Sequence, residues 1–196
     1  MSTYSAPVKD MLFAIQELAD LENVASLSRC EEATPDLVNS VLEEAAKFAN
    51  GIWAPLNRVG DVEGAKWNDG QVVDARRLPG SLSAFRRSRV EWIAVRCGIW
   101  RQGLPKLVDA AVMEMWNGAT LGFALVSLLT QGAMEAILLR GTEAQKQKYL
   151  PRMVAGEWTG TMNLTEAQAG SDLALLRTSA VREGDHYRIR AQKIFI

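Results

Sequence analysis

The chain has 196 residues, 48% of them hydrophobic and 23% charged, and its 22 Lys and Arg residues against 23 Asp and Glu residues give a net charge of −1. This composition excludes disorder caused by low hydrophobicity and high net charge, and it argues against nucleic-acid binding because there is no excess of cations to meet phosphates. Two widely spaced cysteines, Cys30 and Cys97, and a single histidine, His186, predict no disulfide framework, no metal site and a reducing, cytoplasmic location.

Two amphipathic helices are predicted at the start of the chain. Residues 8–28 carry apolar side chains at helical spacing, namely Val8, Met11, Leu12, Ile15 and Leu18. Thr34 is a good N-cap and Pro35 suits the first turn of a second helix, which we expect Pro55 to stop. The apolar positions of this second helix are Leu37, Val38, Val41, Leu42, Ala45, Phe48 and Ile52. Residues 55–80 contain Asn, Gly and Pro at short intervals, which predicts an irregular segment with turns.

Three further helices are predicted from local signals in the middle of the chain. One covers the eighties and nineties, and the next begins after Pro105. Thr142 and Gln145 have the spacing of a capping box, so another helix is expected to start there and to end at Gly156.

The most apolar stretch begins at Ala119 and is predicted to be a helix that ends with Gly141 as its C-cap. Gln131 and Glu135 interrupt it, so its uncharged, strongly apolar part stops at Thr130. That length is shorter than the roughly 18–20 residues that a bilayer-spanning helix needs. We therefore expect no membrane span and a buried helix.

After Gly156 the pattern of apolar residues changes from helical spacing to alternation. Residues 157–165, 176–182 and 187–196 are rich in Thr, Val and alternating apolar positions, and residues 183–185 provide a turn between the last two runs. The predicted fold is therefore a mainly α-helical bundle followed by the first strands of a β-domain, α+β overall. The expected domains are residues 1–156 and 157–196.

The last predicted strand has not finished its alternation at Ile196. A sheet of so few strands needs a packed partner to be stable. Two interpretations remain open: the helical bundle covers this small sheet, or the chain is the front portion of a longer protein, which we favour.

The segment 161–172 carries most of the chemical signal. Its Gly170, Ser171 and Asp172 can form a loop whose backbone N–H groups and hydroxyl cradle an anion. The alternative is a polar turn in which Asp172 acts as a cap. The residues alone leave both interpretations open.

Three ordered motifs in the C-terminal part resemble the acyl-CoA dehydrogenase family of flavoproteins. The segment 165–172, TEAQAGSD, resembles the family signature TEPxAGSD. Residues 141–151, GTEAQKQKYLP, resemble the segment that leads out of the family's helical domain, and residues 193–196, KIFI, resemble its K-x-aromatic-I strand. Motifs at residues 4–11, 55–61 and 156–162 are similar to those of a branch of long bacterial members.

This resemblance implies an FAD-dependent oxidation of an acyl-CoA to the α,β-enoyl-CoA, with electron-transfer flavoprotein as the acceptor and a homo-oligomeric full-length protein. It implies that Thr165 and the backbone around it bond the pyrimidine end of the flavin, that Ser171 lies near the FAD pyrophosphate and the bound thioester, and that Phe195 stacks beside the flavin. The implied cofactor-binding residues are Met162, Leu164, Thr165, Gly170, Ser171, Phe195 and Ile196, and Ser171 is also the implied substrate-binding residue.

The resemblance implies no catalytic residue within the chain, because the family's catalytic glutamate lies in a C-terminal helical domain that follows the segment matched here. Glu166 is expected to stabilise its loop rather than to transfer protons. We therefore expect the 196-residue chain to be inactive by itself. Without the C-terminal helical domain, we also expect the apolar helix from Ala119 and the last strand to expose apolar surface, which favours association.

The chain departs from the family pattern at three places, and the departures at Ala167 and at Trp100 and Arg101 support an alternative function, a non-catalytic helical module that binds a partner and retains the fold. Ala167 replaces the usual proline, which raises the entropic cost of ordering the loop. Met162 replaces a common aromatic residue, although the bacterial branch shares it. Trp100 and Arg101 stand where the branch usually has two glycines, and their bulk would obstruct an acyl pocket.

Overall fold

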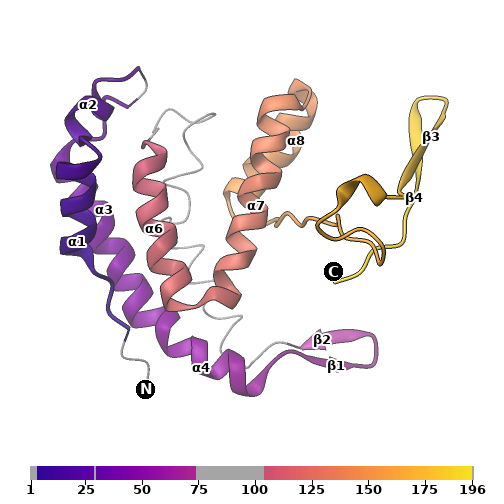
Figure 1. Ribbon diagram of the computed structural model, residues 1–196, viewed down its shortest axis with the longest axis horizontal. Coiled ribbons are helices and arrows are strands. Elements are labelled where there is room, and N and C mark those ends of the chain that lie inside the picture. The colour runs from indigo at the N-terminus through magenta and orange to yellow at the C-terminus, as the bar shows by residue number, and fades with distance from the viewer. Residues whose placement is uncertain (1–3, 29, 74–103, 196) are drawn as a thin grey trace. The chain divides into compact units, whose positions relative to one another are not determined.

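The computed structural model describes residues 4–28, 30–73 and 104–195 (Figure 1). The chain forms two compact units, Met1–Gly160 and Thr161–Ile196. The first unit is mainly helical and the second contains an antiparallel hairpin, so the α+β fold class is confirmed. Several predicted features lie outside the described residues: the helix of the eighties and nineties, Cys97, Trp100, Arg101 and Ile196.

The elements follow one another along the chain as the bar of Figure 1 shows. The helical unit contains α1 (Val8–Phe13), the π-helix η1 (Ala14–Leu18), α2 (Leu21–Ala25), α3 (Pro35–Phe48), the π-helix η2 (Ala49–Trp53), α4 (Ala54–Glu63), β1 (Lys66–Asn68), β2 (Gln71–Val73), α6 (Lys106–Ala119), α7 (Leu121–Arg140) and α8 (Glu143–Val154). The second unit contains the 3₁₀-helix η5 (Leu173–Leu175), β3 (Ser179–Glu183) and β4 (His186–Arg190).

The first predicted helix, residues 8–28, is broken into α1, η1 and α2. Asp20 has a φ of 54°, which ends the helical path, and its carboxylate accepts a hydrogen bond from the Asn23 N–H at the start of α2. Asp tolerates this left-handed conformation better than most residues and is a preferred N-cap. The prediction of one continuous helix was therefore wrong at Asp20.

The prediction that Pro55 stops the second helix is also wrong. Thr34 caps α3 as expected, by accepting a hydrogen bond from the Leu37 N–H, but the helical path continues through η2 into α4. In η2 the Ala54 N–H donates to the Ala49 carbonyl, five residues back. Such a widened turn relieves the clash that a proline ring makes with the carbonyl four residues before it.

The segment 55–80, predicted to be irregular, begins with α4 and continues as a hairpin. Strands β1 and β2 pair antiparallel with Asn68 opposite Gln71, which leaves Asp69 and Gly70 as a two-residue loop. Their φ values are 44° and 82°, and a tight hairpin loop of this kind requires positive φ at both positions. The Asn-Asp-Gly sequence was correctly predicted as a turn, but the short strands beside it were missed.

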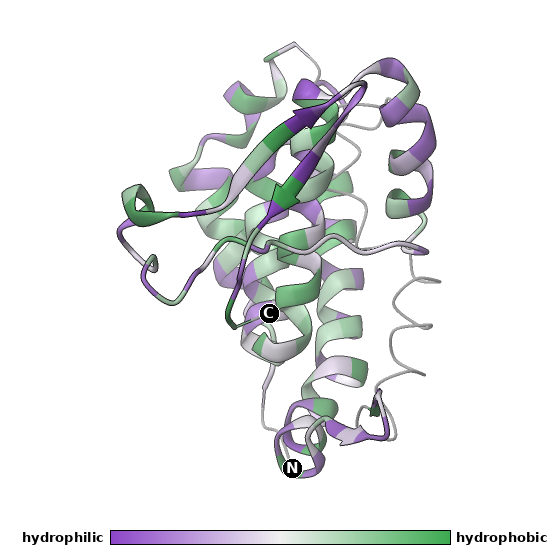
Figure 2. Cartoon of the chain, turned by 90° about the vertical axis from the view of Figure 1, so that its right-hand side faces the viewer, coloured by the Kyte–Doolittle hydropathy of each residue, from purple (hydrophilic) through white to green (hydrophobic). Residues whose placement is uncertain are grey.

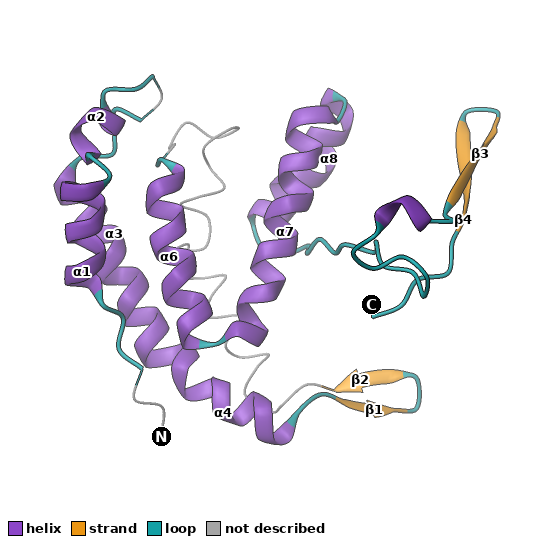
Figure 3. Ribbon diagram, viewed as in Figure 1, coloured by secondary structure: helices purple, strands orange, loops and turns teal. Residues whose placement is uncertain are grey.

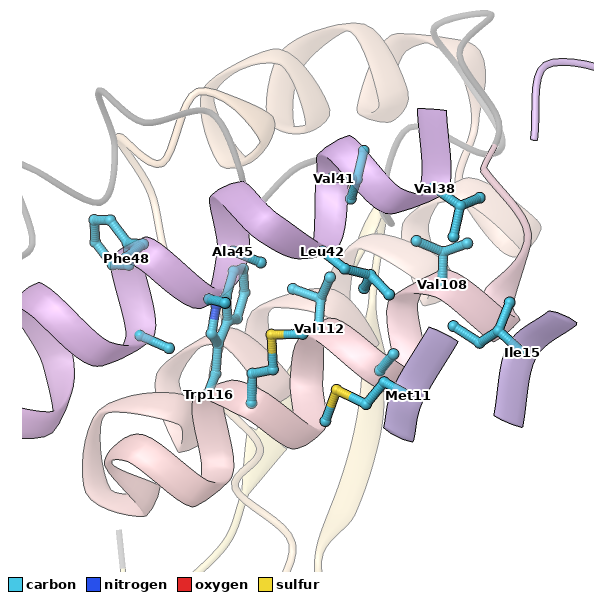
Figure 4. Packing of buried hydrophobic residues seen from close by; sticks show 14 of the residues in the cluster. Met11, Ile15, Val38, Val41, Leu42, Ala45, Phe48, Val108, Val112 and Trp116 are labelled. Carbon is cyan, nitrogen blue, oxygen red and sulfur yellow. The ribbon is translucent and has the colours of Figure 1, made fainter. Parts of the chain in front are cut away.

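The main core lies among α1, η1, α3, η2 and α6, and Figure 4 shows side chains from α1, η1, α3 and α6 meeting there. In α6 the buried face includes Val108, Ala111, Val112 and Met115. Most apolar positions predicted for the helix that starts at Pro35 are buried: Val38, Val41, Leu42, Ala45 and Phe48. Leu37 is 40% exposed and was wrongly placed among them. Ile52 is only partly buried, so the spacing of apolar residues predicts the buried face correctly except at its two ends.

An aromatic cluster joins η2 to α6 and α7. Trp53 is fully buried, and its ring centroid lies 5.3 Å from that of Trp116, 5.0 Å from that of Phe123 and 5.6 Å from that of Phe48. These distances are typical of favourable tilted and edge-to-face aromatic pairs. Because Trp53 ends the π-helix, the widened turn also determines where this cluster forms.

The apolar helix α7 is much less buried than expected. Its buried residues are Ala124, Ser127, Thr130 and Met134, which lie on the side that packs against α6 and α8. On another side Leu121, Leu125, Leu128 and Leu139 are 57%, 47%, 51% and 73% exposed. We call these four leucines the α7 apolar face. The prediction of a buried helix was wrong, whereas the expected apolar surface is observed.

In the part of the chain that the structure describes, α7 is the one helix that is long and apolar enough to cross a membrane, judged by length and composition only. Only 22% of its most apolar window is buried. The core helix of a soluble protein meets the same criterion, so this finding does not by itself place α7 in a bilayer.

Helix α8 and the segment after it are fixed by local caps. Thr142 and Gln145 form the predicted capping box, and Gly156, with a φ of 69°, ends the helix as expected. Gly160 then lies against α7: its N–H donates to the Thr130 hydroxyl at 3.1 Å, and a Cβ at Gly160 would lie 2.5 Å from the Cβ of Ala133. The end of the helical unit is therefore tied to α7.

The second unit has fewer and shorter strands than predicted. Residues 157–165 form no strand, and β3 and β4 begin and end at residues other than those expected, although the turn at Gly184 and Asp185 is confirmed. Both strands are exposed along almost their whole length, with hydrophobic residues between hydrophilic ones (Figure 2). Within the described residues β3 and β4 pair only with each other, and a sheet usually needs more strands or a packed partner to be stable.

We predict that Gly160→Ala lowers the free energy of unfolding by about 1–3 kcal/mol, because the added methyl group overlaps Ala133. Urea unfolding followed by tryptophan fluorescence measures the change. Gly132→Ala is the matched control, since Gly132 lies in α7 with open space around its Cβ, and alanine there should stabilise the helix. Equal stabilities for Gly160→Ala and the unchanged chain would contradict the tight contact.

We also predict that the 196-residue chain self-associates through the α7 apolar face. Replacing Leu125 and Leu128 by lysine should shift the chain toward the monomer, because charged side chains resist burial in an apolar contact. Sedimentation velocity at several concentrations measures this shift. Leu18→Lys, at a 74% exposed leucine in the π-helix η1, is the control and should change nothing.

Candidate cofactor site

The sequence-predicted site residues from Met162 to Phe195 lie in a loop-rich part of the second unit (Figure 3). Met162 is 62% exposed, and Leu164 and Thr165 are half-buried in an extended stretch. This stretch is fastened to the end of the described chain, because the Ile194 N–H donates to the Thr165 carbonyl at 3.1 Å. Residues 29 positions apart in sequence are thereby brought side by side.

A tight turn follows this stretch. The Glu166 N–H donates to the Ala169 carbonyl at 3.1 Å, and the Ala169 N–H donates back to the Glu166 carbonyl at 3.0 Å. This reciprocal pair closes the turn that contains Ala167, although the proline usual in the family is absent. After the turn Asp172 caps η5 by accepting a hydrogen bond from the Ala174 N–H at 3.1 Å. The alternative role foreseen for Asp172, a cap, is therefore observed.

The carboxylate of Glu166 is the centre of a hydrogen-bond network. Its side chain is 4% exposed. The Gln168 amide donates to Oε2 at 2.6 Å, as does the Arg177 N–H at 2.9 Å. The N–H and the hydroxyl of Thr178 and the ammonium of Lys193 donate to Oε1. A buried carboxylate with donors on both oxygens is well satisfied, and we call this group of residues the Glu166 network.

This network lowers the pKa of Glu166 well below its ordinary value. The hydrogen bond from the Thr178 hydroxyl contributes most, followed by those from the Arg177 N–H and from Lys193, while burial opposes them. The carboxylate is therefore ionised across the physiological pH range, and its oxygens are already occupied by donors. This geometry suits a group that stabilises the loop, as the sequence predicted, and not a general base.

Lys193 joins the two stretches that the sequence assigned to the cofactor. Its side chain is 16% exposed, and its ammonium donates to the Leu164 carbonyl at 2.8 Å and to the Glu166 carboxylate at 3.0 Å. Lys193 belongs to the K-x-aromatic-I motif, but it was not predicted as a site residue. Its partners lie 29 and 27 positions away, so only the folded chain reveals the contact.

Phe195 is 92% exposed and has a φ of 59°. A bulky side chain is uncommon in this left-handed region, which marks the position as unusual. Phe195 is not part of a strand, because β4 ends at Arg190, and its ring is open to solvent. Phe195 is thus a free aromatic surface two residues from Lys193.

The predicted anion-binding residues present free donors. Gly170 and Ser171 are exposed, and within the described residues their N–H groups, like the hydroxyls of Ser171 and Thr165, donate no hydrogen bond inside the chain. Such donors match the phosphate and carbonyl oxygens of a flavin nucleotide, so the residues present fit FAD chemically. No group of three metal-ligating side chains was found among the residues that the structure describes.

Comparisons with known proteins show what the chain is similar to. Residues 101–157 match the family model of the acyl-CoA dehydrogenase N-terminal domain. The chain is also 40% identical over 99% of its length to 3-methylmercaptopropionyl-CoA dehydrogenase of Ruegeria pomeroyi, and 27% identical over 98% of its length to a butyryl-CoA dehydrogenase of Syntrophomonas wolfei. The predicted resemblance to the acyl-CoA dehydrogenase family and to its bacterial branch is therefore confirmed.

The chain spans about one third of the length of these relatives, 33% and 32% respectively. A solved structure described as an electron transferring flavoprotein of Acidaminococcus fermentans is also similar, with a TM-score of 0.64 and 25% sequence identity. This similarity covers 81% of the present chain and 39% of the solved one. The comparisons thus agree on a fold that relatives carry as one part of a longer chain.

We predict that the amides of Arg177 and Thr178 are protected from hydrogen exchange by the ionised Glu166 carboxylate. A group whose pKa is lowered by folding stabilises the fold above its ordinary pKa, and this contribution is lost as the pH falls through the lower value of the folded state. Protection should therefore persist at pH 4.5, the ordinary pKa of glutamate, and decline only in stronger acid. Hydrogen exchange measured by NMR, corrected for intrinsic rates, tests this.

In Glu166→Gln the protection of these two amides should be weaker at every pH at which Glu166 is ionised in the unchanged chain, and it should lose its pH dependence. Glu183→Gln, at the partly exposed Glu183 that pairs with Arg188 in the same unit, is the control and should leave both amides protected. Unchanged protection in Glu166→Gln would show that the carboxylate does not hold the loop.

Proposed function

We propose that the chain is the N-terminal part of an FAD-dependent acyl-CoA dehydrogenase that oxidises an acyl-CoA to its α,β-enoyl-CoA. The observation that carries this proposal is a set of donors that donate no hydrogen bond within the described residues: those of the exposed Gly170 and Ser171 and the hydroxyl of the half-buried Thr165, all in the motif that resembles the family signature. The relatives named above, which are acyl-CoA dehydrogenases, support it.

In this proposal, residues of the second unit bind FAD at two places, its flavin ring and its pyrophosphate. The backbone from Met162 to Thr165 and the Thr165 hydroxyl donate to the pyrimidine end of the ring, Gly170 and Ser171 donate to the pyrophosphate, and Phe195 stacks beside the ring. Donors at the pyrimidine end stabilise negative charge on the reduced cofactor. FAD, when bound, supplies the acceptor for the hydride that leaves the acyl chain.

In the full-length protein, we expect the rest of the active site and the electron acceptor to be those of the family. Ile196 would continue the flavin contact, Ser171 would also approach the thioester of the acyl-CoA, and the catalytic glutamate would come from a later domain. Electron-transfer flavoprotein would accept the electrons in a homo-oligomeric, cytoplasmic enzyme. The similarity to a structure described as an electron transferring flavoprotein supports flavin chemistry in this fold.

A second candidate function is a non-catalytic helical module that binds a partner protein. The α7 apolar face favours it, because a face of this kind is common where two proteins meet. The two candidates differ in their need for flavin. A full-length protein that is purified without yellow colour and does not bind added FAD would support the module and contradict the enzyme.

We predict that Ser171→Ala in the full-length protein weakens FAD retention by about two- to tenfold, the loss expected for one hydrogen bond to a bound ligand. Flavin released by denaturation and measured by absorbance gives the bound fraction. Ser26→Ala is the control, since Ser26 lies in the helical unit and its hydroxyl donates to the Asn23 carbonyl. Equal flavin contents in the two variants would contradict the role of Ser171.

We further predict that the 196-residue chain alone shows no acyl-CoA dehydrogenase activity, whereas the full-length protein does. A missing general base alone lowers the rate by about 10²–10⁴-fold. Reduction of a dye acceptor by acyl-CoA substrates of several lengths measures the activity of each. Turnover by the short chain would show that this part already contains a complete site.

A further inference from the structure

The Glu166 network connects the two stretches that the proposed function places around the flavin. Three hydrogen bonds join residues 164–166 to residues 193–194: those from Lys193 to the Leu164 carbonyl at 2.8 Å and to Glu166 at 3.0 Å, and that from the Ile194 N–H to the Thr165 carbonyl at 3.1 Å. Two of the three come from one ammonium group. All of these residues lie within the second unit.

The consequence concerns Thr165 and Phe195. Thr165 lies between the two acceptors of the Lys193 ammonium, and Phe195 follows Lys193 by two residues. The hydroxyl of Thr165 and the ring of Phe195 are both left without a partner in the described residues, and Phe195 is 92% exposed. The ammonium, together with the Ile194 N–H, therefore ties the stretch that carries a free donor to the stretch that carries a free aromatic ring.

We propose that Lys193 is a positioning residue for the flavin: its ammonium, held by Glu166 and the Leu164 carbonyl, fixes the Thr165 donor and the Phe195 ring at the separation that the flavin requires. This proposal rests on the proposed function and deepens it. Lys193 acts through Thr165 and Phe195 and need not touch the cofactor. A displacement of about 1 Å in groups that align a bound reactant is enough to lower the reaction rate substantially.

A lysine suits this role for physical reasons. An ammonium has three donors on one atom, so it can serve a carboxylate and a carbonyl at once. The Glu166 carboxylate is itself held by Gln168, Arg177 and Thr178, so it cannot turn to follow a displaced partner. Loss of the ammonium would remove the donor from the Leu164 carbonyl and one of the donors from Glu166, which keeps those of Gln168, Arg177 and Thr178. Of the three bonds that hold residues 193–194 to residues 164–166, only that of Ile194 would remain.

The test uses the full-length protein with Lys193→Met, which keeps the length of the stem and removes the ammonium. We expect the dissociation constant for FAD to rise about tenfold, the visible absorption band of the bound flavin to shift and its fluorescence to increase. Lys193→Arg keeps the charge and donors to both acceptors and should restore the native spectrum. A residue that only stabilises the fold would alter melting but leave the spectrum of the bound flavin unchanged.

Lys146→Met is the matched control, because Lys146 is also partly buried, 27% exposed, and pairs with Glu143 at 2.8 Å, but lies in the helical unit. It should leave FAD binding and spectrum unchanged. If Lys193→Met does not fold, the same spectrum is recorded for Lys193→Gln, which can donate to one acceptor at a time and should show a smaller shift in the same direction.

The outcomes separate this inference from the proposed function. If the unchanged protein binds FAD and both Lys193→Met and Lys193→Gln give its native spectrum and affinity, the positioning role is wrong while the flavoprotein proposal stands. If the unchanged protein does not bind FAD, the proposed function fails, and with it the role of Lys193. A shifted spectrum that Lys193→Arg restores and Lys146→Met does not produce supports the inference.

Discussion

One ionised carboxylate holds the second unit together. Among its described residues, Glu166 and Ala169 are buried, and both strands of the hairpin are almost fully exposed, so this unit has no apolar core of its own. Its order comes from donors that converge on Glu166 from three separate stretches of chain. A polar network can specify one arrangement when every member is satisfied, and here the donors occupy both oxygens.

The helical unit, in contrast, is held together by the packing of apolar side chains. Its helix caps are formed by residues close to one another in sequence. The capping box of Thr142 and the cap at Thr34 depend on residues three positions away, and the buried face of α3 depends on spacing alone. Both could therefore be predicted from the sequence. The break at Asp20 and the π-helix before Pro55 could not, because each results from the competition between a local preference and tertiary packing of the helix.

The candidate site shows the same division between local and distant information. The loop at Gly170 and Ser171 was predicted from its residue types and from the resemblance, since both signals lie within a few positions. The partners of Glu166 lie 12 and 27 positions away at Thr178 and Lys193, and no sequence pattern connects them. The role of Glu166 in its loop was predicted, but the residues through which it acts were not.

The network also bears on the choice between the two candidate functions. Ala167 supports the non-catalytic module only if the missing proline leaves its loop loose. The turn is instead closed by the reciprocal Glu166–Ala169 backbone bonds, and the Glu166 carboxylate fastens it to Thr178 and Lys193. These contacts restrict the chain as a proline would, since each lowers the number of conformations the loop can adopt. The departure at Ala167 therefore does not by itself remove the geometry on which a flavin site depends.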